Sequence, residues 1–141
     1  MQQHLTLEDL TPETLLQLVL DEGYTAHIDD TRAVLFSGEV VLLDPCLDQR
    51  TLHLRIPFWF KARHLDALKF CNRINRKSVM IRASLAPERD AQRDWCVVID
   101  REIPLLPGQT IAREDLLVLL RRFIEFGNED ILEFDTAGLL D

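Results

Sequence analysis

The chain has 141 residues, 24 aspartates and glutamates against 16 lysines and arginines, and a formal net charge of −8. This length matches one ordinary domain that can bury a core without disulfides, so we expect a single domain over residues 1–141 with its core at about 11–132. The acidity excludes a general polyanion binder, because nucleic-acid affinity rests mainly on phosphate neutralisation by Lys and Arg, and we expect no nucleic-acid partner.

The ends and the cysteines restrict the cellular location. The first residues contain neither the basic segment nor the apolar core of a secretory signal. Apolar runs such as residues 40–43 are far shorter than the ~20 residues that cross a bilayer. Three cysteines without a C-x-x-C pair fit reduced thiols better than a disulfide framework. We therefore expect a cytoplasmic protein that does not enter a membrane.

The first predicted element is a helix from Thr11 to about residue 22. Thr11 suits the N-cap, Pro12 suits the first helical position, and Glu13 lies at the positive end of the helix dipole. Apolar residues then recur on one helix face, and Gly23 permits the left-handed conformation of a C-terminal cap.

Alternation of apolar and polar residues follows this helix and predicts strands. The predicted strands are residues 24–28, 33–36, 39–43 and 51–56. The first two read as a hairpin around Asp29-Asp30, and residues 44–49 read as a loop. In the fourth strand Leu52, Leu54 and Ile56 alternate with polar residues, so we expect one of its faces in solvent.

A second helix is predicted over residues 62–76. Its apolar side is assigned to Leu65, Leu68, Cys71 and Ile74. Lys69, Arg73 and Arg76 are expected in solvent.

The rest of the chain predicts a second hairpin and a third helix. Strands are expected at residues 78–85 and 95–99, joined by a polar loop at 87–94. The last helix, residues 112–126, has a wide apolar face and ends at Gly127-Asn128, with a further turn left open at residues 131–134. The order is therefore α-β-β-β(-β)-α-β-β-α, an α+β fold with helices packed on an antiparallel sheet.

Two short segments within this order carry a family resemblance. Phe70-Cys71-Asn72-Arg73-Ile74-Asn75 ends the middle helix, and Pro107-Gly108-Gln109-Thr110 leads into the last one. Together with the element order, these two segments resemble the YbjN-like family of bacterial sensory transduction regulators. The resemblance extends from about Thr11 to Leu132.

The resemblance implies a fold similar to that of type III secretion chaperones, which are small acidic dimers that hold partner polypeptides. It implies a non-enzymatic protein that works through protein contacts, and a homodimer. No catalytic residue is carried over from the family. Asn72 and Asn75 are expected to have a structural role at the helix end, where Asn satisfies free carbonyls or adopts the left-handed conformation.

Catalytic and metal-binding signatures are otherwise missing from the sequence. His27 and His53 occupy polar positions of predicted strands, where they could share a sheet face with Asp29, Asp44 or Asp48, but no H-x-H, H-x-x-x-H or H-E-x-x-H spacing occurs. A histidine on the polar face of a strand is usually solvated. We expect no enzymatic activity, no metal and no cofactor.

Three consecutive aromatic residues, Phe58, Trp59 and Phe60, follow the strand that ends at Ile56. Successive side chains diverge in either regular geometry, so the three rings cannot all enter one core. One reading places at least one ring in a binding surface, because Trp and Phe are enriched in binding hot spots. The alternative is that the rings plug the corner between sheet and helix.

Charge is distributed unevenly along the chain. Residues 1–49 carry one base and ten acids, residues 50–82 carry nine bases and one acid, and residues 83–141 carry six bases and thirteen acids. The basic middle segment suits electrostatic steering of an acidic protein partner, or neutralisation by the acidic flanks within the fold or across a dimer. The candidate steering residues are Lys61, Arg63, Lys69, Arg73, Arg76 and Lys77.

These observations favour a chaperone-like or regulatory protein that binds another protein or peptide through an apolar patch around residues 58–60. The alternative function is a regulator of bacterial stress or motility that senses a small ligand in a concave site between the sheet and the helices.

Overall fold

The computed structural model describes residues 3–60, 64–78, 80–86 and 95–135. Its helices are α1 (Pro12–Asp21), α2 (His64–Lys77), α3 (Arg113–Asn128) and the short 3-10 helix η1 (Asp130–Phe134). Its strands are β1 (His4–Leu5), β2 (Thr25–Asp29), β3 (Arg32–Ser37), β4 (Glu39–Cys46), β5 (Thr51–Phe60), β6 (Arg82–Leu85), β7 (Trp95–Pro104) and β8 (Ile111–Ala112). The predicted loop at 87–94 lies outside the described residues.

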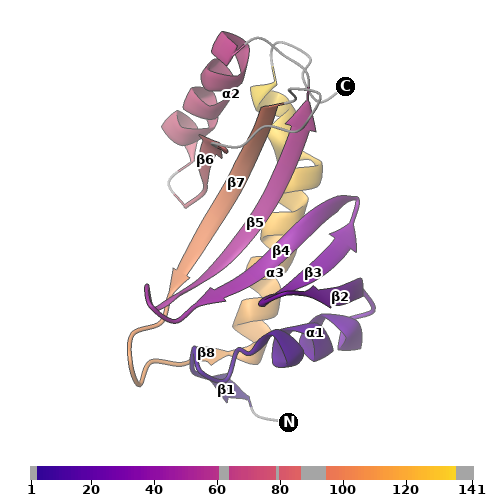
Figure 1. Ribbon diagram of the computed structural model, residues 1–141, viewed down its shortest axis with the longest axis vertical. Coiled ribbons are helices and arrows are strands. Elements are labelled where there is room, and N and C mark those ends of the chain that lie inside the picture. The colour runs from indigo at the N-terminus through magenta and orange to yellow at the C-terminus, as the bar shows by residue number, and fades with distance from the viewer. Residues whose placement is uncertain (1–2, 61–63, 79, 87–94, 136–141) are drawn as a thin grey trace.

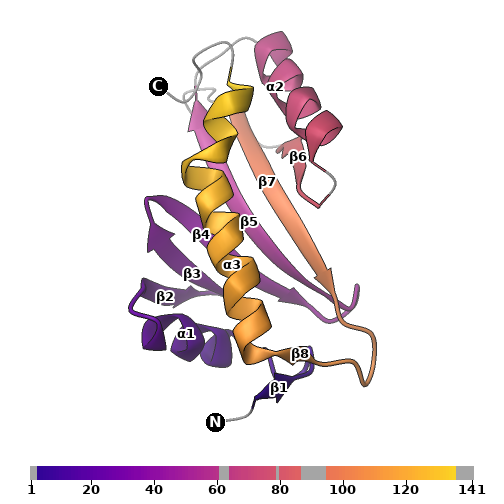
Figure 2. The ribbon, with the colours of Figure 1, turned by 180° about the vertical axis from the view of Figure 1, so that it is seen from behind.

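Six strands form one antiparallel sheet in the order β2-β3-β4-β5-β7-β6, and β1 pairs with β8 in a separate two-stranded sheet. The six-stranded sheet lies in front of α3 in Figure 1, and the reverse view in Figure 2 shows α3 running across its strands. The α+β class and the antiparallel sheet predicted from the sequence are therefore confirmed.

The two faces of this sheet follow from the alternation within β5. One face, called here the helix face, packs under α3 and carries the buried apolar residues Leu52, Leu54, Ile56 and Phe58. The opposite face, called here the open face, carries the intervening residues Thr51, His53, Arg55, Pro57 and Trp59. The core on the helix face also takes in Leu5, Leu7 and Leu10, which precede residue 11.

Three strands continue several residues past their predicted ends. β4 continues through Asp44-Pro45 to Cys46, where a loop was predicted, and β5 continues through Pro57 to Phe60. Each proline lies beyond the end of the pairing with one neighbouring strand: β3 pairs with β4 only as far as Leu43, and β4 pairs with β5 only as far as Arg55. The missing N–H therefore costs no ladder bond on that side. β7 likewise runs to Pro104.

The apolar side predicted for α2 is wrong in its first half. Leu65 and Leu68 are 54% and 38% exposed. The buried residues are instead Ala67, Phe70, Cys71 and Ile74. A spacing of three residues drifts around a helix of 3.6 residues per turn, so Leu65 and Ile74 lie on opposite sides. The spacing of three and four in the buried set keeps one face inward.

The ends of the other predicted elements are closer to the structure. Thr11 caps α1 by accepting a hydrogen bond from the Thr14 amide at 3.2 Å. β6 is shorter than predicted: it begins at Arg82, and residues 78 and 81 lie before it. α3 ends at Asn128, and the further turn left open by the sequence forms as η1. Gly127 is a buried residue inside α3, where an added Cβ would clash with the Cδ1 atom of Ile56.

Candidate interaction face and polar network

The aromatic run divides between the two faces of the sheet. Phe58 is 6% exposed and belongs to the core, whereas Trp59 is 51% exposed on the open face. The Phe60 side chain lies outside the described residues. The alternative that the rings plug the corner between sheet and helix is therefore wrong for Trp59. Its exposure follows because β5 continues past Pro57 and turns this side chain to the open face.

Trp59 lies among apolar residues of the neighbouring strand. Cys96 is its ladder partner on β7 and is buried, and Val98 on the same strand faces Pro57. Phe36, 44% exposed, lies further across the open face on β3, and its ring stacks on His27 at 5.4 Å between centroids. The open face therefore presents two exposed aromatic rings with half-buried apolar residues beside them.

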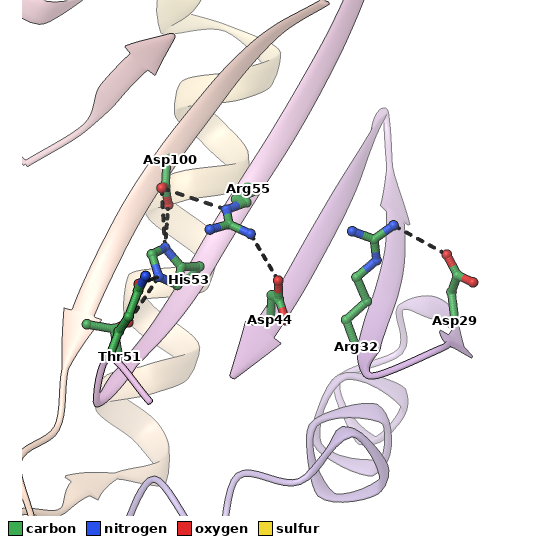
Figure 3. Close-up of polar contacts among 8 residues, drawn as sticks. Asp29, Arg32, Asp44, Thr51, His53, Arg55 and Asp100 are labelled. Atoms are coloured by element: carbon green, nitrogen blue, oxygen red, sulfur yellow. Dashed lines mark hydrogen bonds and ion pairs between the residues drawn. The ribbon is translucent and has the colours of Figure 1, made fainter. Parts of the chain in front are cut away.

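The middle of the open face is a polar network centred on His53 (Figure 3). The Nδ1 atom of His53 lies 3.2 Å from both carboxylate oxygens of Asp100. Its Nε2 atom lies 3.0 Å from the Thr51 hydroxyl and 3.2 Å from the Gln49 Oε1 atom. The prediction of a solvated His53 is wrong, because its side chain is held between these groups and is only 3% exposed.

Arg55 links this network to β4. Its Nη1 atom donates to Asp44 at 2.9 Å, and its Nε atom lies 3.7 Å from Asp100. Asp44 thus shares the sheet face of His53, as predicted, but its partner is the guanidinium. Sequence reasoning missed Asp100, because the predicted strand 95–99 stopped one residue before it. The antiparallel pairing of β5 and β7, which places Arg55 opposite Asp100, supplies the contact.

One group of potential metal ligands occurs here among the described residues: a nitrogen of His53 and carboxylate oxygens of Asp100 and Glu102 lie within 4.8 Å of one another. Nitrogen and oxygen donors of this kind suit zinc or another divalent ion. However, both imidazole nitrogens already have hydrogen-bond partners, and the Arg55 guanidinium lies beside Asp100. The arrangement therefore favours an ion-paired network, and the expected lack of a metal stays a prediction.

The candidate steering residues separate in the structure. Lys61 and Arg63 lie outside the described residues. Lys69, Arg76 and Lys77 are exposed on α2 and make no ion pair within the described part of the chain. Arg73 is half-buried, and its Nε atom donates to the carbonyl of Phe134 at 2.7 Å, so it ties α2 to η1 and is not free in solvent.

Asn75 closes one edge of the sheet. Its amide nitrogen donates to the Ala83 carbonyl at 2.8 Å, and its Oδ1 atom accepts from the Ala83 amide at 2.7 Å. β6 is the outermost strand, so Asn75 occupies the backbone groups that another strand would use. α2 ends at Lys77, so Asn75 lies in its last turn, as predicted, but its side chain bonds to the backbone of β6. Asn72 is exposed, and its structural role stays a prediction.

No helix among the described residues is long and apolar enough to cross a membrane.

Comparisons with known proteins agree on one family. The family model YbjN, described as a "putative bacterial sensory transduction regulator", matches residues 1–136. The structure is similar to the crystal structure of YbjN from E. coli, with a TM-score of 0.71 and 18% sequence identity over 90% of this chain and 93% of that one. At this identity the likeness shows the fold. No curated protein matches the sequence.

Proposed function

Since this chain belongs to the YbjN family, we propose that it is a non-enzymatic regulatory protein that binds another protein or peptide across the open face of its sheet. The family is described as a sensory transduction regulator, which fits a regulatory role. The exposed ring of Trp59, at the far end of β5, is the observation that carries the proposed binding.

Trp59 has the properties of an interface anchor. A half-exposed tryptophan has apolar area that a partner can remove from water, and tryptophan is enriched among residues that dominate binding energy. Its strand supplies a rigid base, because β5 pairs with β7 over its whole length. The bound side chains of the partner would be aliphatic or aromatic, since the neighbours of Trp59 on this face include Pro57 and Val98.

The charge of α2 supports an acidic partner. Lys69, Arg76 and Lys77 are exposed and have no intramolecular ion pair among the described residues. Unpaired positive charge attracts an acidic segment and raises its association rate, an effect that falls as salt is added. We therefore propose an acidic peptide segment with apolar side chains as the partner class.

The test is affinity capture with wild-type protein, with Trp59→Ala and with Leu106→Ala. Leu106 is the matched control, because it is an apolar residue 55% exposed outside the sheet. A bound protein that is retained by Leu106→Ala and lost by Trp59→Ala supports the proposal, with a loss of roughly 2 kcal/mol or more for a hot-spot residue. Equal capture by both variants would refute the role of the open face.

The homodimer inferred from the family resemblance stays a prediction. A two-fold dimer is the commonest assembly of a single chain type. Light scattering at several concentrations tests it, and a mass that stays at 16.4 kDa throughout would contradict it.

A further inference from the structure

An arginine stands on the apolar helix face of the sheet. Arg101 lies on β7 between the buried residues Ile99 and Ile103, and its ladder partner on β5 is the fully buried Leu54. Successive strand residues alternate between faces, so Arg101 points to the side that α3 covers. Arg101 as a whole is half-buried, but its Nε–H group is shielded from water, and a shielded donor requires a partner because leaving it without one is costly.

The described protein supplies no such partner. The Nε atom of Arg101 is buried and has no hydrogen-bond acceptor. No acidic side chain among the described residues forms an ion pair with Arg101 or with Arg122 on α3. A buried donor without an acceptor is uncommon in native proteins and often marks the position of a bound group.

A cavity of about 220 Å³ lies beside these two arginines. It is lined by Met80, Ile81, Arg101, Leu119, Arg122 and Phe123. The half-buried Arg101 and the exposed Arg122 thus contribute two basic side chains to an otherwise apolar lining, and no carboxylate is among the described residues that line it. Such a site combines the charge that binds an oxyanion with surface that buries a hydrocarbon chain.

We propose that this cavity binds a small carboxylate with a short apolar tail. The carboxylate accepts hydrogen bonds from Arg101 and Arg122, and the tail contacts Leu119 and Phe123. The site goes beyond the proposed protein-binding function, because it lies on the opposite side of the sheet from Trp59. It has the position between sheet and helix that a ligand-sensing regulator would use.

The first experiment is an NMR titration of the full chain with three probes: butyrate, inorganic phosphate and butylammonium. Saturable shifts of the Arg101 side-chain Nε–Hε signal and of the Leu119 and Phe123 amides with butyrate support the proposal. Phosphate tests the anion without the tail, and butylammonium tests the tail with the opposite charge. Absence of butyrate binding, equal binding of butylammonium, or phosphate binding as tight as butyrate would each overturn it.

Substitutions test which arginines bind. Arg101→Met and Arg122→Gln should each weaken butyrate binding by roughly 10- to 100-fold, the range for a hydrogen bond to a charged group. Arg121→Gln is the matched control, because Arg121 is exposed on the same helix and does not line the cavity. It should bind butyrate as the wild type does.

Thermal unfolding gives an independent readout. Without ligand, Arg101→Met should unfold at a higher temperature than the wild type, because it removes a buried donor that has no acceptor. Butyrate should raise the unfolding temperature of the wild type and of Arg121→Gln, but not that of Arg101→Met. Unchanged butyrate affinity in Arg122→Gln overturns the site even if Arg101→Met fails to fold. If the site is overturned but the wild-type protein still captures a partner that Trp59→Ala loses, the protein-binding function stands.

Discussion

The two faces of the six-stranded sheet are made by the same strands but are stabilised differently. On the helix face, Leu52, Leu54 and Ile56 are fully buried in the core under α3. On the open face, His53 is almost equally buried but is held by Asp100, Thr51 and Gln49. His53 is therefore buried as deeply as the core, although the other open-face residues of β5 are half-buried or exposed. What differs is that apolar packing tolerates no free space, whereas the polar face depends on paired donors and acceptors.

Each face also contains one residue that departs from its chemistry. Trp59 is an exposed apolar ring on the polar face, and Arg101 has a buried Nε–H donor without an acceptor on the apolar face. Both departures occur where the sequence no longer agrees with the demands of the fold. Such local conflicts are expected at functional sites, which fits partner binding at Trp59 and carboxylate binding at Arg101.

The largest expected effect compares two neighbours on β5. Leu54→Ala should reduce the free energy of unfolding by about 2–5 kcal/mol, because it opens a cavity under α3. His53→Ala should reduce it by about 1–3 kcal/mol, because Asp100 loses a hydrogen-bond partner. Chemical denaturation of both variants measures the difference. A larger loss for His53→Ala would show that the polar face contributes more to stability than the core face.

The edge of the sheet at β6 offers the next comparison. Asn75→Ala should destabilise the protein by about 1–3 kcal/mol, because the amide and carbonyl of Ala83 lose their partners. The freed edge should also promote aggregation at high protein concentration. Asn72→Ala is the control, since Asn72 is exposed on the same helix, and it should change stability by no more than about 0.5 kcal/mol. Equal losses of stability in the two variants would contradict the edge-closing role of Asn75.

A smaller effect is expected where α3 touches the helix face. Gly127→Ala places a methyl group against the Cδ1 atom of Ile56, and overpacking costs about 1–3 kcal/mol, partly offset by the better helix propensity of Ala, about 1 kcal/mol. Ile56→Val removes that Cδ1 atom. In the Ile56→Val background, Gly127→Ala should therefore become stabilising. A double-mutant cycle in denaturant measures this coupling, and additive effects would show that the contact does not restrict position 127.

The last comparison depends on pH and concerns a thiol buried on α2. Burial raises the pKa of the Cys71 thiol from 9.0 to about 11. Between these values the unfolded thiol has lost its proton while the folded one keeps it, so stability falls as pH rises through this window. Cys71→Ala should lose less stability than the wild type from pH 9.0 to about 11. Parallel curves for the two proteins would contradict a buried, neutral thiol.

Local sequence signals predicted the fold more completely than the site. Thr11 with Pro12 located the start of α1, and the alternation of Leu52, Leu54 and Ile56 located the core side of β5, because both depend on residues close in the chain. The strand ends were missed at Pro45 and Pro57. A proline ends a strand only where both neighbours are present, and that depends on the sheet.

The candidate residues show the same limit. The sequence predicted that Phe58, Trp59 and Phe60 could not share one core, but not which ring would be exposed. It placed His53 on a polar face without its partner Asp100, which is 47 residues away in the chain. No sequence pattern singled out Arg101, because the predicted strand ended at residue 99. Its position among core residues requires that β7 extend to Pro104 and pair with β5.

The sequence by itself determined the α+β class, the order of the main elements and an uneven charge with a basic middle. These follow from short-range periodicity, capping and composition. Only the tertiary structure decided that Asn75 closes the β6 edge, that Arg55 pairs with Asp44, and that Lys69, Arg76 and Lys77 of α2 have no ion pair among the described residues. The physical reason is that pairing and burial depend on distances between residues far apart in the chain, which only the packed sheet and helices define.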